Sequence, residues 1–460
     1  MYFCVGKTEK SMLKRKIDSY LEHFFQRKTQ ALLITGARQT GKSFSIRQFG
    51  TSHYENFVEI NFVEMPEAAN ILSGAKNSKD ILSRLSLLTT KKLVPGKTMV
   101  FFDEVQECPK IVTAIKFLVE EGSYRYVLSG SLLGVELNDL RSEPVGYMDV
   151  KEMFPLDIEE FFEALGVSSH VIKDIRDAWE KRVPVDDFIH NQLLNLFKLY
   201  LIVGGMPAAV QKYIDTNNLQ TVMEEQQAIV RLYKRDIAKY DKNHKLYIEE
   251  IFDLIPPELN AKNKRFILKN LNENLKFSRY ENSFLWLKDA GVALPTYNVE
   301  EPVVPLKLSR SRNLFKLFQN DIGLLASQYA DGIQLRLLNE EKGINFGSIY
   351  ENVVAQELRA HGFELYYFNS KKQGELDFVI EYQGKVLPIE VKSGKDYQRH
   401  NALTGVMANV DYQIPEAIVF SHANVRHVGK IAYLPIYMVA FLERNYDVNL
   451  TYKPDMTGLY

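Results

Sequence analysis

Ala31-Leu-Leu-Ile-Thr35, followed by Gly36-Ala37-Arg38-Gln39-Thr40-Gly41-Lys42-Ser43, is the stretch that decides the fold. The second part has the spacing G-x-x-x-x-G-K-[ST] of a P-loop, and it stands between a short apolar run and a helical pattern. Glycines let backbone N–H groups close around phosphates, while Lys42 supplies a positive charge to the β and γ phosphates. Ser43 is expected to ligate Mg²⁺. The stretch therefore predicts an ATP site.

A second stretch, Met99-Val-Phe-Phe-Asp103-Glu104, places two carboxylates after four apolar residues. This is expected where a buried parallel strand ends at the phosphate edge of the sheet. Asp103 would hold the Mg²⁺ shell, and Glu104 would polarise the attacking water. The pair favours hydrolysis of ATP over storage of the nucleotide.

Further polar residues could serve this site. The apolar run Tyr126–Ser129 ends in Ser129-Gly130-Ser131, where a hydroxyl could sense the γ-phosphate. An arginine from the helical lid or from a neighbouring subunit would stabilise transition-state charge, which leaves a homo-oligomer open. The candidates are Arg125, Arg141 and Arg235. Sequence does not choose among them.

The whole chain reads as an α/β protein of several domains, because 460 residues exceed one ordinary core. Apolar runs at 31–35, 57–62, 99–102 and 126–129 predict a parallel sheet with crossover helices. Helical spacing then dominates, and Gly204-Gly205-Met206-Pro207 predicts a turn between helices. The expected units are a P-loop ATPase domain at 1–155, a helical lid at 156–244, a winged helix at 245–335 and a nuclease-like domain at 336–460.

Several stretches beyond the P-loop carry a family resemblance. They are Phe101-Phe-Asp-Glu-Val-Gln106, Leu128-Ser-Gly-Ser131, Pro155-Leu-Asp-Ile-Glu-Glu-Phe161, Gly204-Gly-Met-Pro207, Phe315-Lys-Leu-Phe318 and Asp321-Ile-Gly-Leu-Leu325. Through them the chain resembles, over nearly its whole length, the bacterial and archaeal AAA-type ATPases with a C-terminal domain of unknown function. The resemblance implies an AAA module, a helical lid, a winged helix and a C-terminal domain of the restriction-endonuclease-like fold. Family members usually have Gly-Arg where this chain has Leu140-Arg141, so the resemblance assigns Arg141 no role.

The C-terminal region contains a hairpin whose register can be worked out. If Gln383-Gly384 form a two-residue turn and Tyr382 pairs with Lys385, then Asp377 lies opposite Glu390. Like charges on facing positions are destabilising, and a shared divalent cation would remove that cost. Pro388 within the second strand could shift this register.

This hairpin supplies the residue types of the restriction-endonuclease-like metal site, Asp377, Glu390 and Lys392, with Glu351 on the preceding helix. Carboxylate oxygens would hold Mg²⁺ with room for water and a phosphate, and Lys392 could activate the attacking water. The alternative is a solvated hairpin face that merely carries charges.

Residues 261–280 are locally basic. They contain Lys262, Lys264, Arg265, Lys269, Lys276 and Arg279 against the single acid Glu273. Such an excess could neutralise DNA phosphates, although a charge run is commonly a solvated helix face, and winged helices also contact proteins. DNA contact through this segment and the C-terminal domain is the prediction.

The composition restricts the expected partners and cellular location of the protein. The net charge of -1 gives no global attraction to nucleic acid or acidic membranes, and Cys4 and Cys108 are too few for a disulfide framework. With no apolar stretch of spanning length, a cytoplasmic location without membrane contact is expected. The resulting hypothesis is an ATPase that couples nucleotide state to DNA binding or processing. The alternatives are an ATP-dependent switch for a protein partner, with a non-catalytic nuclease-like module, and a toxin-like or mobile-element defence protein.

Overall fold

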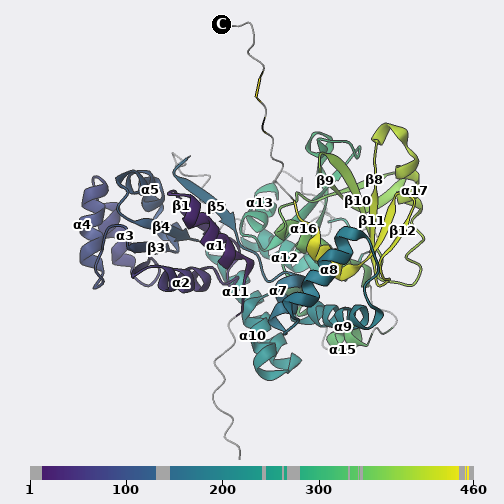
Figure 1. Ribbon diagram of the computed structural model, residues 1–460, viewed down its shortest axis with the longest axis horizontal. Coiled ribbons are helices and arrows are strands. Elements are labelled where there is room, and N and C mark those ends of the chain that lie inside the picture. Colours follow the sequence, from purple (N-terminus) through teal and green to yellow (C-terminus); the bar gives the residue numbers. More distant parts are fainter. Residues whose placement is uncertain are drawn as a thin grey trace, which may run out of the picture.

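A computed structural model of the chain describes residues 13–130, 146–240, 245–261, 264–266, 280–329, 332–339, 341, 346–444, 451, 453 and 454. It contains two β-sheets, which lie toward opposite ends of the long axis, with helices between them (Figure 1). The first sheet belongs to the N-terminal part and the second to the C-terminal half.

The N-terminal sheet is parallel, with strand order β2-β3-β4-β1-β5. Its strands are β1 (Ala31–Thr35), β2 (Asn56–Asn61), β3 (Thr98–Asp103), β4 (Arg125–Ser129) and β5 (Met148–Glu152). The four strands expected from the apolar runs are confirmed to within one residue at each end. β5 was not foreseen, because this edge strand is only partly buried and reads as Met-Asp-Val-Lys-Glu.

Helices cover both faces of this sheet, as the alternating pattern predicts. On one face, α1 (Lys16–Arg27) and α2 (Lys42–His53) bury Leu21, Phe24 and Phe49 against the strands. On the other face lie α3 (Pro66–Ser73), α4 (Ser78–Leu88) and α5 (Pro109–Glu121). The loop between β1 and α2 lies at the carboxyl edge of the sheet, the usual place for a ligand in such folds.

The helical connector follows β5. It consists of α7 (Ile158–Ala164), α8 (Ser169–Lys181), α9 (Asp187–Val203), α10 (Pro207–Thr216) and α11 (Leu219–Tyr240). The turn expected at 204–207 separates α9 from α10, where Gly204 has the positive φ that glycine tolerates. Among the described helices none alone is long and apolar enough to cross a membrane; α9 and α10 meet that test only as a pair bent by 118°.

The second sheet has eight strands in the order β12-β13-β11-β10-β9-β8-β6-β7. Their bounds are β6 (Ala293–Val299), β7 (Arg310–Gln319), β8 (Tyr366–Ser370), β9 (Gly374–Tyr382), β10 (Lys385–Val391), β11 (Ala417–Ser421), β12 (Arg426–Val428) and β13 (Ile431–Pro435). Helix α16 (Phe346–Ala360) packs against β6, β7 and β10. The other α-helices described in this half are α12 (Lys245–Asn260), α13 (Glu281–Asp289), α14 (Ile322–Ala326), α15 (Ile333–Leu338) and α17 (Asn401–Ala408).

This sheet crosses the boundary expected between residues 335 and 336. β6 pairs in parallel with β8, and β7 pairs with β6. The β6–β7 hairpin, which would be the wing of a winged helix at 245–335, is therefore an edge of the same sheet that holds the C-terminal strands. The pairing of β6 with β8 joins segments far apart in sequence, so no local pattern announced it.

The hairpin register is confirmed over the paired residues. Lys385 lies opposite Tyr382, and Ile389 lies opposite Phe378. Gln383 and Gly384 both have positive φ, as the tightest hairpin turns require. Pro388 pairs opposite Val379 without shifting the ladder.

Candidate functional site

The P-loop has the geometry its sequence predicts. It runs from the end of β1 into α2, and Gly41 caps this helix with φ 97°. Gly36 leaves no room for a side chain, since a Cβ there would lie 2.2 Å from the carbonyl oxygen of Met153. Lys42 Nζ donates hydrogen bonds to the carbonyl oxygens of Gly36 (2.9 Å) and Ala37 (2.7 Å). Burial lowers the pKa of Lys42 to about 8, although Glu104 and Asp103 act in the opposite direction.

Asp103 is the centre of the polar network behind this loop. Its Oδ1 accepts hydrogen bonds from Ser43 Oγ at 3.0 Å and from Ser129 Oγ. Its Oδ2 accepts one from Asn61 Nδ2 at 3.0 Å. Sequence reasoning grouped Ser43 and Asp103 and named Ser129 nearby, but it missed Asn61. The signal was available, because Asn61 ends β2 at the same edge of the sheet.

Glu104 takes a different direction from Asp103. It has the left-handed backbone angles φ 56° and ψ 50° at the start of a short 3-10 turn. It faces a cleft of about 880 Å³ that it shares with Lys42 and Ser43. Gln106 Nε2 donates a hydrogen bond to its carboxylate. The arrangement puts one acid behind the phosphate loop and one beside the open cleft.

The connector forms the other wall of this cleft. Its lining residues from the connector are Pro207, Ala208 and Gln211 of α10 and Leu232 of α11. The cleft is also lined by Leu13, Arg15, Arg38, Gln39, Gly41, Phe44, Ser45 and Arg47. Arg15, which sequence reasoning missed, is buried and donates from Nη1 to the carbonyl oxygen of Thr40 at 3.0 Å. Its Nη2 donates to the carbonyl oxygen of Phe154 at 2.8 Å. It thereby fixes the P-loop to the segment that leads into α7.

The loop also contacts the connector and lies close to the start of the second sheet. Arg38 forms an ion pair with Asp236 of α11 at 2.8 Å, and Tyr233 Oη donates to the carbonyl oxygen of Arg38 at 3.1 Å. Gly291, just before β6, lies so close that an added Cβ would stand 3.2 Å from the backbone nitrogen of Ala37. Ala37 itself is buried in the core that the connector shares with the second sheet.

The three candidate arginines have different places. Arg125 begins β4, at the edge of the sheet away from the P-loop, and it lines a separate cleft with Glu22 and Tyr54. Arg235 is an exposed residue of α11. Arg141 and Ser131 lie outside the described residues. Arg125 therefore does not reach the nucleotide cleft of its own chain.

In the C-terminal half, Glu351, Asp377, Glu390 and Lys392 lie in one cluster with three further charged residues. We call Glu351, Glu375, Asp377, Glu390, Lys264, Lys316 and Lys392 the acid–lysine cluster. Lys392 Nζ donates to Glu390 Oε1 at 2.6 Å, and Asp377 Oδ2 accepts from the backbone nitrogen of Val391 at 2.8 Å. Glu351 contacts Lys264 and, at 3.4 Å, Lys316.

Lys316 changes the charge argument for this cluster. Its side chain is fully buried on β7, and its Nζ also lies 2.8 Å from Glu375 Oε1. Burial acts to raise the pKa of Glu351, but the charges of Lys316 and Lys264 outweigh it and lower this pKa. For Asp377, burial and the charges of Glu351 and Glu390 raise the pKa well above its usual value. Lysine ammonium groups therefore already offset part of the negative charge of this cluster, a role that the sequence argument gave to a shared divalent cation. Glu351, Asp377 and Glu390 do not bring three oxygens within 4.8 Å of one another.

The basic segment at 261–280 also differs from expectation where it is described. Lys264 is directed to Glu351, with its side chain 20% exposed, and Arg265 lies 3.8 Å from Glu375. These two side chains meet carboxylates, so they do not form the free basic face that was predicted. Lys262, Lys269, Lys276, Arg279 and Glu273 lie outside the described residues.

Three regions of the chain match known family profiles. A family profile described as "AAA domain" matches residues 28–162. Residues 194–335 and 346–438 match "Domain of unknown function (DUF8612)" and "Domain of unknown function (DUF4143)". No curated protein matches the chain significantly.

Solved structures give distant likenesses. The Walker-type ATPase PABY2304 of Pyrococcus abyssi is 14% identical, with a TM-score of 0.41 over 69% of this chain and 96% of that chain. The ORC2 protein of Aeropyrum pernix in its ADP form is 11% identical, with a TM-score of 0.30 over 73% and 96%. Drosophila ORC bound to DNA is 13% identical, with a TM-score of 0.26 over 59% and 80%.

The P-loop geometry, the polar network around Asp103 and the match over residues 28–162 agree with one another. The N-terminal part of the chain is an AAA-type ATP-binding domain, and it is followed by two regions that match domains of unknown function.

Proposed function

We propose that this protein hydrolyses ATP and passes the nucleotide state to its C-terminal half. The observation that carries the proposal is the division of labour between Asp103, held by Ser43 and Ser129 behind the loop, and Glu104, which faces the cleft. A carboxylate beside the γ-phosphate position can orient and deprotonate water, which is the base role in this chemistry.

The residues present fit a magnesium ion. Ser43 Oγ and Asp103 Oδ1 are oxygen atoms 3.0 Å apart beside the P-loop, and Mg²⁺ prefers oxygen ligands. Ser43 and Asp103 would hold the ion, which would neutralise charge on the β and γ phosphates. Lys42 would leave the carbonyl oxygens of Gly36 and Ala37 to reach the phosphates.

The route to the C-terminal half is supported by direct contacts. Arg38 pairs with Asp236 of the connector helix α11, and the backbone of Ala37 lies close to Gly291, just before β6 of the second sheet. A phosphate that moves the loop would therefore change packing against both. The response of that half is either DNA binding and processing or the binding of a protein partner.

DNA processing by the nuclease-like region is the second candidate. What supports it is that Glu351, Asp377, Glu390 and Lys392 do gather, and that Glu390 Oε2 is buried without a hydrogen-bond donor among the described residues. What weighs toward a non-catalytic interaction module is the presence of Lys264 and Lys316 among the acids.

One experiment separates these readings. Purified protein is incubated with linear, branched or single-stranded DNA, with Mg²⁺ or Mn²⁺, with and without ATP, and phosphate release and DNA cleavage are measured together. Glu104→Gln should abolish phosphate release. Cleavage that requires Mg²⁺ or Mn²⁺ and disappears in Asp377→Ala would support the nuclease; ATP hydrolysis without cleavage, unaffected by DNA, would favour the protein-partner switch. No phosphate release under any condition would contradict the ATPase itself.

DNA binding has its own test. If Lys262, Lys264, Arg265 and Lys269 meet phosphates, binding should weaken steeply with salt, and neutralising all four should flatten that slope. Because Lys264 and Arg265 already contact Glu351 and Glu375, we expect Lys262 and Lys269 to account for more of the slope. Absence of salt-dependent binding would exclude this surface.

A further inference from the structure

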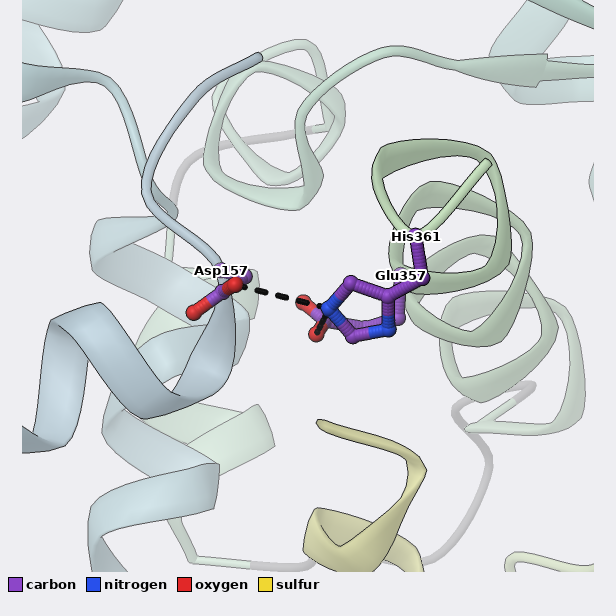
Figure 2. A group of neighbouring side chains, drawn as sticks. All are labelled: Asp157, Glu357 and His361. Atoms are coloured by element: carbon purple, nitrogen blue, oxygen red, sulfur yellow. Dashed lines mark hydrogen bonds and ion pairs between the residues drawn. The ribbon is translucent and has the colours of Figure 1, made fainter. Parts of the chain in front are cut away.

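Three side chains of the metal-ligand type meet where the AAA domain leads into the rest of the chain. Asp157 caps the start of α7, whereas Glu357 belongs to α16 and His361 follows its end (Figure 2). His361 Nε2 lies 3.4 Å from Asp157 Oδ2 and 3.9 Å from Glu357 Oε2. One ligand atom from each residue lies within 4.8 Å of the other two. This group is separate from the nucleotide cleft and from the acid–lysine cluster.

Glu357 leaves one oxygen without a partner. The residue is fully buried. Its Oε1 accepts hydrogen bonds from the backbone nitrogen of Ile158 at 3.2 Å and from Tyr200 Oη at 3.3 Å. Its Oε2 is buried, accepts no hydrogen bond from the described residues, and points toward His361 (Figure 2). A buried carboxylate oxygen without a donor is costly, so this atom needs a proton or a cation.

The other charges around the group are already paired. The pairs are Lys16 with Asp157 and Glu159, each at 2.7 Å, Arg15 with Glu160 at 3.1 Å, and Arg176 with Glu159 at 2.9 Å. Burial and the charge of Asp157 raise the pKa of Glu357 well above its ordinary value, although Lys16 acts in the opposite direction. Apart from His361, no charged partner of the carboxylate of Glu357 is seen in the described part of the chain.

His361 is oriented as metal-binding histidines usually are. Its Nδ1 lies 3.1 Å from the carbonyl oxygen of Leu442. A carbonyl can only accept, so Nδ1 carries the hydrogen and Nε2 is directed at the two carboxylates. Metal-ligating histidines commonly donate their other nitrogen in this way, which fixes the ring and the tautomer.

We propose that Asp157, Glu357 and His361 form a binding site for zinc or a similar late first-row divalent cation. One imidazole nitrogen and two carboxylate oxygens suit such an ion better than Mg²⁺ or Ca²⁺, which take mainly oxygen ligands. Ligands of a tetrahedral zinc lie about 3.3–3.6 Å apart, so the observed 3.4 and 3.9 Å need only small side-chain shifts. The ion would tie the start of α7 to the end of α16.

Lys16 is the internal competitor for this ion. Its Nζ shares Asp157 Oδ2 with His361, but it also bonds Glu159, and its side chain is 42% exposed. On metal binding it can therefore stay with Glu159 and turn toward solvent. Removing its charge should strengthen metal binding.

The test uses the full-length protein, stripped by a chelator and free of nucleotide. Zinc is titrated by calorimetry, and Co²⁺ is followed by its visible absorption. Wild type should bind zinc, Glu357→Gln and His361→Ala should bind at least about 10-fold more weakly, and Lys16→Met should bind more tightly. Glu357→Gln keeps an oxygen that can accept hydrogen bonds from the backbone nitrogen of Ile158 and from Tyr200 Oη, so we expect this variant to fold.

Two controls identify the site. His170→Ala removes an exposed histidine that lies 3.6 Å from Asp174 on α8, a pair able to hold zinc adventitiously, and it should change nothing. Asp377→Ala removes a member of the acid–lysine cluster and should also leave this binding intact. The proposal is overturned if wild type binds no zinc, if Glu357→Gln and His361→Ala bind like wild type, or if binding is lost in either control. A gain of affinity in Lys16→Met cannot arise from misfolding, and its absence would also count against the site.

Discussion

The carboxylate of Asp321 accepts a hydrogen bond from the backbone nitrogen of Gly205 at 2.7 Å, across 116 residues of sequence. The same side chain caps α14 by accepting from the backbone nitrogen of Leu324 at 2.9 Å. The two stretches are so close that a Cβ on Gly204 would lie 2.4 Å from Asp321 Oδ1. Pro207, two residues beyond Gly205, lines the nucleotide cleft. Asp321 therefore fixes one wall of that cleft to the C-terminal half.

The first prediction concerns the stability that Asp321 contributes. Burial raises its pKa from 3.8 to about 6, so between these values the folded state binds more protons than the unfolded state. Its contribution to the free energy of unfolding is then fully present below about pH 4 and lost as the pH rises through about 6. Asp321→Asn has no such group, so it should destabilise the protein more at pH 4.5 than at pH 7. Urea unfolding at both pH values measures this, and an equal loss would contradict it.

The second prediction separates the roles of Lys42 and Glu104. Lys42→Ala should weaken ATP binding, because it removes the charge that meets the phosphates. Glu104→Gln should keep binding and lower the hydrolysis rate by about 100-fold or more, since it removes the base but not the loop. Calorimetry measures the ATP affinity, and phosphate release measures the hydrolysis rate. Equal loss of ATP affinity in both variants would disprove the assignment.

The third prediction follows from the pKa of Lys42, which burial lowers to about 8. Phosphates favour the charged amine, so ATP binding should be accompanied by proton uptake near pH 8, and affinity should fall as the pH rises above this value. Titrations in two buffers of different ionisation enthalpy measure the protons taken up. In Lys42→Arg the side chain stays charged, so the pH dependence of ATP affinity near pH 8 should disappear. Its persistence would assign the titration to another group.

The fourth prediction tests the contact between the P-loop and Gly291. An alanine there meets the backbone nitrogen of Ala37 and also adopts φ +71°, which costs about 1 kcal/mol. Gly166→Ala is the matched control, because Gly166 has φ +90° and a Cβ added there would have no other atom of the described residues within 4 Å. Both variants should lose similar stability, but only Gly291→Ala should weaken ATP binding by several-fold. If the two bind ATP alike, this contact does not report on the nucleotide.

The fifth prediction concerns the buried ammonium group of Lys316. Lys316→Met leaves Glu351 and Glu375 without this partner, so the protein should lose about 3–5 kcal/mol of stability, the usual effect of breaking a buried ion pair. If the cluster can also hold a divalent ion, millimolar Mg²⁺ or Mn²⁺ should restore part of that loss. The measurement is thermal unfolding of wild type and Lys316→Met with and without the ions. A variant as stable as wild type in the absence of metal would show that Lys316 is dispensable.

Much of the AAA domain could be predicted because its signals are local. The P-loop spacing and the apolar strands each occupy a few consecutive residues, and the two-residue turn at Gln383-Gly384 fixed the hairpin register by the same logic. The edge strand β5 lacked such a signal, since a half-buried strand does not need to be apolar.

The charged clusters were harder to foresee because their members come from distant segments. Lys316 stands alone in the apolar run from Leu314 to Phe318, a pattern that fits an exposed strand face as well as a buried pair. Glu357 lies in the last turn of α16 and His361 directly follows its end, four residues on, which was a usable signal, but Asp157 joins them only through folding. Sequence periodicity indicates which face of a helix or strand is apolar, but it does not indicate which other helix or strand packs against that face.

The pairing of β6 with β8 also bears on how the C-terminal half can be isolated. A fragment that begins at residue 346 would include α16 and the strands from β8 onward but would lack β6 and β7. Its β8 would then be an open edge with unpaired backbone groups, the kind of surface that recruits other chains into aggregates. Glu351 would also be separated from both of its lysines, Lys264 and Lys316. Recombinant study of this half therefore requires the polypeptide from the start of α12 onward, where all eight strands and both lysines are retained.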